Sequence, residues 1–441
     1  MKLTGLITNI RALQFFQLFR FVVLFAVGIA FAQAGLSNET IGVYEKFIFL
    51  SGAVSFFWVS GLTQSMLSYY SKTVPDKTGK NPFFFHIFII GLTLTVLTSL
   101  LILTADKQIS SLFLSQKEVP YLTAFIIYFL LSTPSFVVEF FYILLKKPKH
   151  IVAYGIITFG VQFIVVIFPI IWGKGLEYSL WGLCIISAIR FLWSLQIIFK
   201  YSSFRFSFNF CKKFLAFSYP LILMAMISGS LPYIDGVFVS HYFDDATFAI
   251  FRYGAREFPL TLLMANALSN AMIPEFSSDT TRSQANAKIK SGSLQLMHIF
   301  FPTSIALLFF SRELYPILFN PDFIQASSIF NILLLLVISR LVFPQTLLLG
   351  YGRNKDLLTA TVIEFVFKVG LTFLLITRYG VFGVAISTVL AFYVEKLWLI
   401  IVLKKKLKLS PKSYIPVNWL VFYSVLLIIV FVYVEYDILF P

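Results

Sequence analysis

Fourteen ionisable side chains interrupt long apolar runs in this sequence, and they are the residues best placed to do chemistry. A charge near the middle of a bilayer costs at least about 2.5–3.5 kcal/mol, so each one needs a partner or a function. The basic set is Arg20, Lys46, Arg190, Arg252, Arg256, Arg340, Lys368 and Lys396. The acidic set is smaller and comprises Glu45, Glu139, Asp235, Glu257, Glu364 and Glu395.

A surplus of cationic groups inside a membrane favours an anionic ligand, for example one that carries phosphate groups. Arginine suits this ligand because its planar guanidinium can bind two phosphate oxygens through parallel hydrogen bonds. Arg20 has no acid near it in its own run. Arg256 follows Arg252 by four residues, which would place both on one helix face. Lys46 and Arg252 lie near the ends of their runs, where snorkelling to the interface is the alternative.

Asp235 and Glu139 are the candidates for a site that binds protons or sodium ions. Asp235 follows Pro232 by three residues, and a proline frees a backbone carbonyl that could assist ion binding. Solvation by water at the outer surface is the alternative for Asp235. An ion pair within one half of the protein is the alternative for Glu139.

Spacing predicts structural roles for several other charges. Glu364 and Lys368 are four residues apart, as in an ordinary pair on one helix face. Glu395 and Lys396 are sequence neighbours whose side chains would point about 100° apart, so we expect them to have different partners. Arg340 is expected to form an ion pair within its own half of the chain.

The elements that position these charges are predicted to be membrane-spanning helices. Apolar residues make up 59% of the 441-residue chain and charged residues only 12%, against about 25% in soluble domains. Because about 20 apolar residues span a bilayer, the sequence predicts an all-α integral membrane protein. Its longest loops have about 20 residues, too few for a soluble catalytic domain. The thirteen predicted spans are residues 12–33, 41–66, 82–104, 120–145, 151–172, 178–200, 214–240, 248–273, 294–315, 324–349, 357–377, 381–403 and 415–434.

The chain contains an internal repeat with an offset of 206 residues. Residues 62–71 match residues 268–277, with Leu62 aligned to Leu268 and Met66 to Met272. The same offset relates Lys46 to Arg252 and Arg190 to Lys396. The repeat predicts two six-helix lobes, residues 1–206 and 207–406, followed by an extra transmembrane or interfacial helix in residues 407–441. Repeated membrane halves are typical of transporters, which bind substrate where the repeats meet.

Loop charges predict the orientation. Twenty-two basic residues fall in loops on the side of the N-terminus, and five fall on the other side: Lys107, Lys117, Lys174, Arg312 and Arg378. Because basic loops stay in the cytoplasm, the N-terminus is expected to be cytoplasmic. The C-terminus would then be external if all thirteen runs cross. The alternative is that residues 415–434 lie along the membrane.

Several stretches resemble a known family. The motif Phe-x-x-Pro-Leu-Ile-Leu at 217–223 follows a basic loop, and the span that it opens ends in polar and aromatic residues with an acid at Asp235. Together with residues 246–253 and 272–274, this pattern resembles the bacterial polysaccharide and O-antigen flippases of the Wzx type. These belong to the multidrug/oligosaccharidyl-lipid/polysaccharide (MOP) exporter superfamily. A thirteenth span departs from the twelve or fourteen common among relatives.

The resemblance implies a fold and a function. It implies two six-helix lobes around a central cavity lined by the first, second, seventh and eighth spans, which carry Arg20, Lys46, Arg252 and Arg256. The implied activity is transport of an undecaprenyl-diphosphate-linked oligosaccharide, an O-antigen or capsule repeat unit, across the bacterial inner membrane by alternating access. Such a protein would serve lipopolysaccharide or polysaccharide biosynthesis.

Three alternatives remain open at this point. A multidrug extruder of the same superfamily would carry organic cations and favour acidic cavity residues. A peptidoglycan-precursor flippase would typically have fourteen spans. A membrane-embedded polysaccharide polymerase or ligase would need a larger exterior loop than this chain offers.

The expected partners are a lipid-linked oligosaccharide and membrane lipids. Nucleic acid is not expected, because the basic residues are spread over short loops. The chain has no P-loop, and its four histidines lack metal-site spacing, so we expect no catalytic residues, no metal and no cofactor apart from a coupling proton or sodium ion. We expect a monomer that could associate with polysaccharide polymerase machinery.

Overall fold

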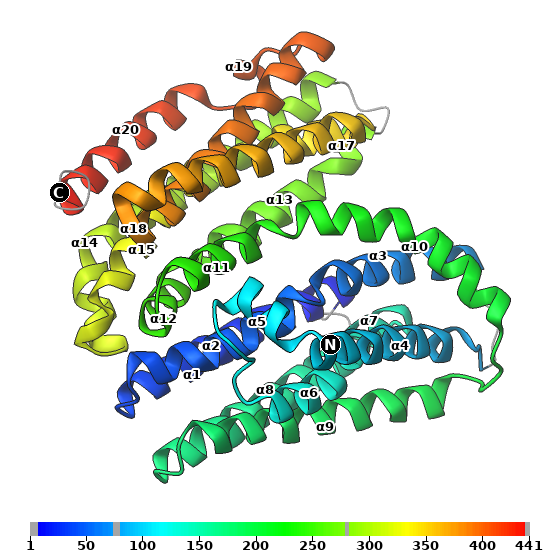
Figure 1. The fold of residues 1–441 in the computed structure, drawn as a ribbon. Coiled ribbons are helices and arrows are strands. Elements are labelled where there is room, and N and C mark those ends of the chain that lie inside the picture. The colour runs from blue at the N-terminus through cyan, green and yellow to red at the C-terminus, as the bar shows by residue number, and fades with distance from the viewer. Residues whose placement is uncertain (1–7, 74–79, 278–281, 437–441) are drawn as a thin grey trace, which may run out of the picture. The chain divides into compact units, whose positions relative to one another are not determined.

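The computed structural model describes residues 8–73, 80–277 and 282–436, and all regular structure in this part of the chain is helical (Figure 1). Lys2 and Lys77, which the loop-charge count includes, lie outside the described residues. The chain divides into two compact units, residues 1–249 and 250–441. The prediction of an all-α multi-pass membrane protein is confirmed.

The first unit comprises eleven α-helices, one 3-10 turn and the start of α12. Its elements are α1 (Asn9–Gln33), α2 (Asn38–Ala53), α3 (Phe56–Thr73), α4 (Phe83–Thr104), α5 (Asp106–Leu114), α6 (Leu122–Ser132), η2 (Thr133–Val137), α7 (Val138–Leu144), α8 (Pro148–Ile171), α9 (Leu176–Tyr201), α10 (Phe208–Ser228) and α11 (Leu231–Tyr242). Polar caps define where helices begin. The Thr8 hydroxyl accepts a hydrogen bond from the Arg11 N–H at α1, and the Ser37 hydroxyl accepts one from Thr40 at α2.

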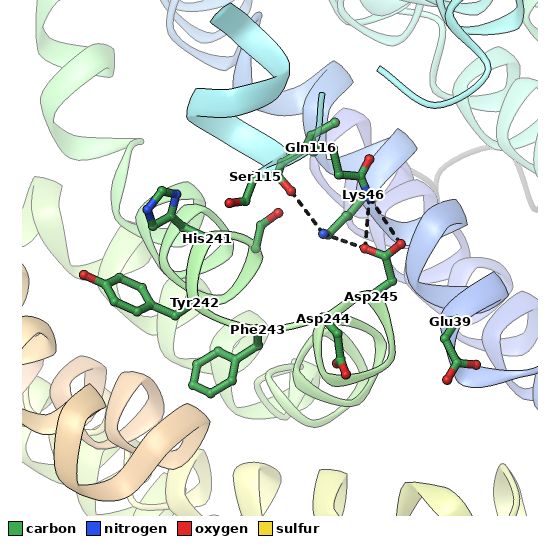
Figure 2. Close-up of a pocket in the computed structure, with 11 residues that line it drawn as sticks. Glu39, Lys46, Ser115, Gln116, His241, Tyr242, Phe243, Asp244 and Asp245 are labelled. Atoms are coloured by element: carbon green, nitrogen blue, oxygen red, sulfur yellow. Dashed lines mark hydrogen bonds and ion pairs between the residues drawn. The ribbon is translucent and has the colours of Figure 1, made fainter. Parts of the chain in front are cut away.

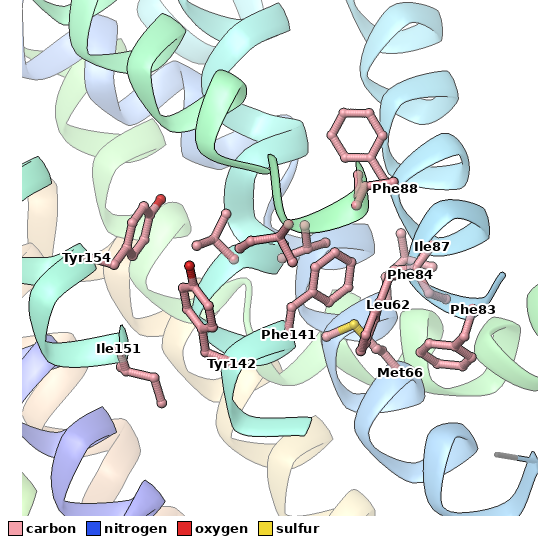
Figure 3. Close-up of a cluster of buried hydrophobic side chains, with 14 of the residues drawn as sticks. Leu62, Met66, Phe83, Phe84, Ile87, Phe88, Phe141, Tyr142, Ile151 and Tyr154 are labelled. Atoms are coloured by element: carbon pink, nitrogen blue, oxygen red, sulfur yellow. The ribbon is translucent and has the colours of Figure 1, made fainter. Parts of the chain in front are cut away.

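An aromatic-rich core joins α3, α4, α7 and α8 in this unit (Figure 3). Phe84 and Phe141 lie with ring centroids 4.5 Å apart. Leu62 and Met66, from the first copy of the repeated motif, are fully buried in this core. In the second copy, the Ser269 hydroxyl hydrogen-bonds Thr346 at 2.6 Å. The motif therefore packs helices together in both copies.

The unit boundary falls at residues 249 and 250, beyond the repeat boundary predicted at residue 206. The reason is that α10 packs along α3, while α11 packs against α2 and α5. The first part of the second repeat therefore belongs to the first compact unit. The division into two six-helix lobes describes the repeat and stays a prediction.

The second unit begins within α12 (Asp245–Gly254). It continues with α13 (Pro259–Ser277), α14 (Arg282–Leu318), η3 (Pro321–Phe323), α15 (Ile324–Leu334), α16 (Val337–Arg340), α17 (Pro344–Gly350), α18 (Asn354–Leu407), α19 (Pro411–Tyr414) and α20 (Val417–Val434). Helix α18 has 54 residues and contains a break at Gly380, whose φ of 55° and ψ of −137° are accessible to glycine but not to most other residues.

Ten helical segments of the described chain are long and apolar enough to cross a membrane, or eleven if α2 and α3, which are bent by 49°, form one span. The sequence predicted thirteen. One of the missing spans lies in α18, which is counted as a single segment. Its 54 residues would extend over about 80 Å at 1.5 Å per residue, which is enough for two crossings. The rest lies in α12 and α13, which a break separates into two shorter helices.

Helix α20 lies beside α14 in a parallel register. The Lys290 ammonium donates to the Lys412 carbonyl at 2.7 Å, His298 bonds the Tyr423 hydroxyl at 2.8 Å, and Arg312 pairs with Glu435 at 3.0 Å. Residues 290 and 312 are about 33 Å apart along a helix, close to the hydrocarbon thickness of a bilayer. Because residues 412–435, which contain α20, follow α14 over this distance, the register favours a spanning helix over an interfacial one.

Candidate functional site

The span that carries Arg252 and Arg256 is interrupted. Arg252 lies in the last turn of α12, whereas Arg256 lies in the non-helical segment 255–258 before α13. The prediction that the two arginines share one helix face is therefore wrong, because the helix ends between them. Both side chains are partly exposed, and the Arg256 guanidinium lies over the Tyr253 ring at 5.0 Å. Broken spans often form substrate sites in transporters.

Arg340 anchors this irregular segment. Its guanidinium donates two parallel hydrogen bonds to the Glu257 carboxylate, at 2.6 and 2.8 Å. The same guanidinium lies over the Phe392 ring at 4.3 Å. The expectation of an ion pair for Arg340 within its own half is confirmed, and the pair fixes Glu257 directly beside Arg256.

Lys46 lies in a fully packed environment. Its side chain is 2% exposed, and its ammonium lies 2.6 Å from the Asp245 carboxylate. It also donates to the Leu114 carbonyl at 3.2 Å and lies over the Phe248 ring at 5.6 Å. Lys46 therefore does not snorkel to the interface, and its charge is neutralised by a carboxylate from the start of α12.

A polar cluster lies within the first unit around Arg190 of α9. Arg190 donates to the Gln162 side chain of α8 at 2.7 Å and lies over the Phe159 ring at 4.7 Å. Glu139 of α7 lies close enough to Arg190 and to Arg20 of α1 for their positive charges to act on its carboxylate. Glu139 is half-buried and Arg20 is exposed.

A corresponding cluster lies in the second unit around Lys396. Its ammonium donates to the Gln345 side chain at 3.0 Å and contacts the Glu395 carboxylate at 3.3 Å. The expectation that Glu395 and Lys396 have different partners is wrong, because both side chains are long enough to curl back toward each other. The 206-residue offset relates Arg190 to Lys396, Glu139 to Gln345 and Gln162 to Lys368. The repeat is thus visible in side-chain chemistry as well as in helices.

Asp235 lies on α11 and is 9% exposed, so it is shielded from the solvent that the sequence suggested could satisfy it. Asp245 and Gln116 were not singled out by the sequence, although both contact each other next to Lys46. The sequence did contain a signal that could have identified Asp245. The 206-residue offset relates Glu39 to Asp245, just as it relates Lys46 to Arg252. Each half therefore carries an acid seven residues before a base.

Comparison with known proteins adds the family. A family model described as "Polysaccharide biosynthesis protein" matches residues 36–328, which is more than half of the chain. The chain belongs to the polysaccharide biosynthesis protein family. The chain is also 27% identical over 146 residues to the probable low-salt glycan biosynthesis flippase Agl15 of Haloferax volcanii. That match covers 31% of the chain and spans 30% of the relative's length.

Solved structures of other proteins share the fold of this chain. The lipid II flippase MurJ in an inward closed conformation has a TM-score of 0.69 at 18% identity, covering 96% of this chain and 97% of that one. An inward-facing multidrug resistance MATE family transporter of the MOP superfamily has a TM-score of 0.64 at 17% identity, covering 89% and 96%. The family match and these two folds confirm the resemblance to the MOP superfamily.

Proposed function

We propose that this protein is a flippase that moves an undecaprenyl-diphosphate-linked oligosaccharide, an O-antigen or capsule repeat unit, across the bacterial inner membrane. Family membership and the similarity to Agl15 and MurJ support this class of transporter over an enzyme. In the proposed orientation the N-terminus is cytoplasmic. The protein acts as a monomer by alternating access, with or without attached polymerase machinery.

The observation that carries the proposal is the arginine-bearing break between α12 and α13. Arg252 lies in the last turn before a non-helical segment of a predicted span, Arg256 lies within that segment, and both side chains are partly exposed. Partly exposed guanidinium groups suit the two phosphates of a lipid diphosphate, because each can bind two phosphate oxygens through parallel hydrogen bonds. Arg20, exposed on α1, is assigned to the same ligand. Lys46 would join them only after release from Asp245.

Coupling to protons or sodium ions is assigned to Glu139 and Asp235. Both carboxylates lie in the first unit, where Asp235 is buried and Glu139 is half-buried. A drug extruder for organic cations fits less well, because the break between α12 and α13 carries two arginines against one acid, Glu257.

The test is complementation of a flippase-deficient strain, scored by surface polysaccharide on a gel. Arg256→Ala should abolish export at near-normal protein level. Arg256→Lys should restore export only in part, because lysine keeps the charge but cannot donate two parallel hydrogen bonds from a planar group. Arg378→Ala, which alters an exposed arginine of α18, is the matched control and should export normally. Normal export by Arg20→Ala, Arg252→Ala and Arg256→Ala alike would exclude these arginines as the diphosphate site.

A further inference from the structure

Asp245 connects three elements at the start of α12 (Figure 2). Its carboxylate accepts from the Lys46 ammonium of α2 at 2.6 Å. It also accepts from the Gln116 amide, which follows α5, at 3.1 and 3.2 Å to its two oxygens. Lys46 and Gln116 belong to the first half of the repeat and Asp245 to the second, although all three lie in the first compact unit. The contact therefore joins the two halves of the repeat.

The burial of this ion pair is asymmetric. Lys46 is 2% exposed and Asp245 is 22% exposed. A cavity of about 500 Å³ opens on the pair and is also lined by Glu39, His241 and Asp244. Water therefore reaches the carboxylate but not the ammonium. If α12 moved away without uncovering Lys46, it would leave a buried, unpaired charge, which is strongly unfavourable. The pair is thus either fully formed or released together with exposure of Lys46.

The backbones in this region are in direct contact. A Cβ added to Gly42 of α2 would lie 1.9 Å from the Asp245 carbonyl oxygen, so no larger residue fits there without moving α12. The same close packing continues along α2 and α3, where Gly52 faces the Tyr233 ring and Gly61 faces Ile222. Packing through small residues allows a tight surface without interlocking side chains.

The segment that carries Asp245 is bounded by breaks in the helical backbone. Residues 229 and 230 separate α10 from α11, and residues 255–258 separate α12 from α13. Such element ends are where hinge motions are absorbed. Residues 243 and 244 also separate α11 from α12, so each of these two helices can pivot about the breaks at its ends.

We propose that Asp245, with Lys46, Gln116 and Gly42, forms a latch that holds α11 and α12 against α2 and α5 and that must release in each transport cycle. The inference rests on the proposed transport function, because the latch is one of the contacts that hold the closed state of the transport cycle. In the conformation that the structure shows, Lys46 is part of the closed latch. A two-state contact of this kind makes the closed state sensitive to a single charge.

The experiment uses the full-length protein with Ser115→Cys and His241→Cys, two exposed residues that line the cavity, one at the end of α5 and the other in the last turn of α11. The native Cys184 and Cys211 are buried and should react slowly. A short bifunctional thiol reagent should join positions 115 and 241 readily. Asp245→Asn should slow this cross-linking roughly fivefold or more, because the closed state is less populated. Asp244→Asn, the adjacent carboxylate on the same cavity, is the control and should leave the rate unchanged.

A second variant keeps every charge. Gly42→Ala should slow cross-linking as Asp245→Asn does, whereas Gly160→Ala, where an added Cβ meets nothing within 4 Å, should not. Unchanged rates in both Asp245→Asn and Gly42→Ala would overturn the latch. This readout needs no substrate, so it is independent of the flippase assignment.

The link to transport is tested separately. In a strain where the doubly substituted protein exports polysaccharide, cross-linking should stop export and reduction should restore it. Undiminished export by cross-linked protein would show that the contact need not open. Failure of the unsubstituted protein to export any polysaccharide would instead overturn the proposed function and leave the cross-linking result standing.

Discussion

Arg340 shows how a charge inside this protein is satisfied by more than one kind of contact. It binds Glu257 through two parallel hydrogen bonds and stacks over Phe392, with both charged side chains 21% exposed. Bidentate geometry combined with an aromatic face is available to arginine and not to lysine. Because Glu257 adjoins Arg256, the same pair fixes the backbone on which a proposed substrate contact depends.

Removal of this pair should destabilise the second unit. Arg340→Ala leaves the Glu257 carboxylate without its donors, and the expected loss is about 1.5–3 kcal/mol, the range for hydrogen bonds to charged groups. Arg340→Lys should recover part of it. Thermal unfolding in detergent measures the effect, with Arg378→Ala expected to stay within about 0.5 kcal/mol of the parent. Equal unfolding temperatures for Arg340→Ala and Arg378→Ala would contradict a structural role for the pair.

Among the elements, α20 has its C-terminal end fixed by buried polar contacts. Glu435, directly after α20, is fully buried between Arg312 of α14 and the Asn331 amide of α15, which donates to it at 2.5 Å. Much of the outward surface of α20 is apolar and exposed, as suits a helix that faces lipid. A carboxylate that is buried at the far end of an apolar helix ties that end to the level of Arg312.

Reporter fusions test whether α20 crosses. A reporter after Ser410 and one after Pro441 should report opposite sides of the membrane, because residues 412–435 follow α14 over about a bilayer thickness. Loop charges further predict that the second reporter is external. Fusions that report the same side would mean that residues 417–434 lie along the membrane.

At the scale of the whole molecule, the repeat governs which positions carry polar clusters. Arg190 and Lys396 are related by the 206-residue offset, and each binds a glutamine side chain within its own unit. The offset also relates Glu139, near Arg190, to Gln345, which binds Lys396. Corresponding positions therefore carry a cation that binds a glutamine in each unit, although the two glutamines do not correspond, since the offset relates Gln162 to Lys368.

This equivalence predicts which substitution is tolerated. Arg190→Lys places at position 190 the residue that works at position 396, so it should cost less than half of what Arg190→Ala costs. The alanine variant is expected to lose about 1–3 kcal/mol, since buried Gln162 is left without its charged partner. Thermal unfolding in detergent compares the two, and equal losses would show that the two clusters are not equivalent.

The sequence by itself determined the helical, membrane-spanning architecture and the repeat. These follow from local properties, because a bilayer requires every backbone group to be hydrogen-bonded within its own segment, and only long apolar helices satisfy this. The candidate cations at positions 20, 252 and 256 were also found from residue type alone.

Only the tertiary structure decided the partners of these charges. Glu257 pairs with a residue 83 positions away and Gln116 with one 129 positions away, and spacing along one helix carries no information about such contacts. The break after α12 was equally hidden, because residues 248–273 form one apolar run in the sequence. Backbone groups freed by a break can be satisfied only by neighbouring elements, so the fold and not the run determines where a helix ends.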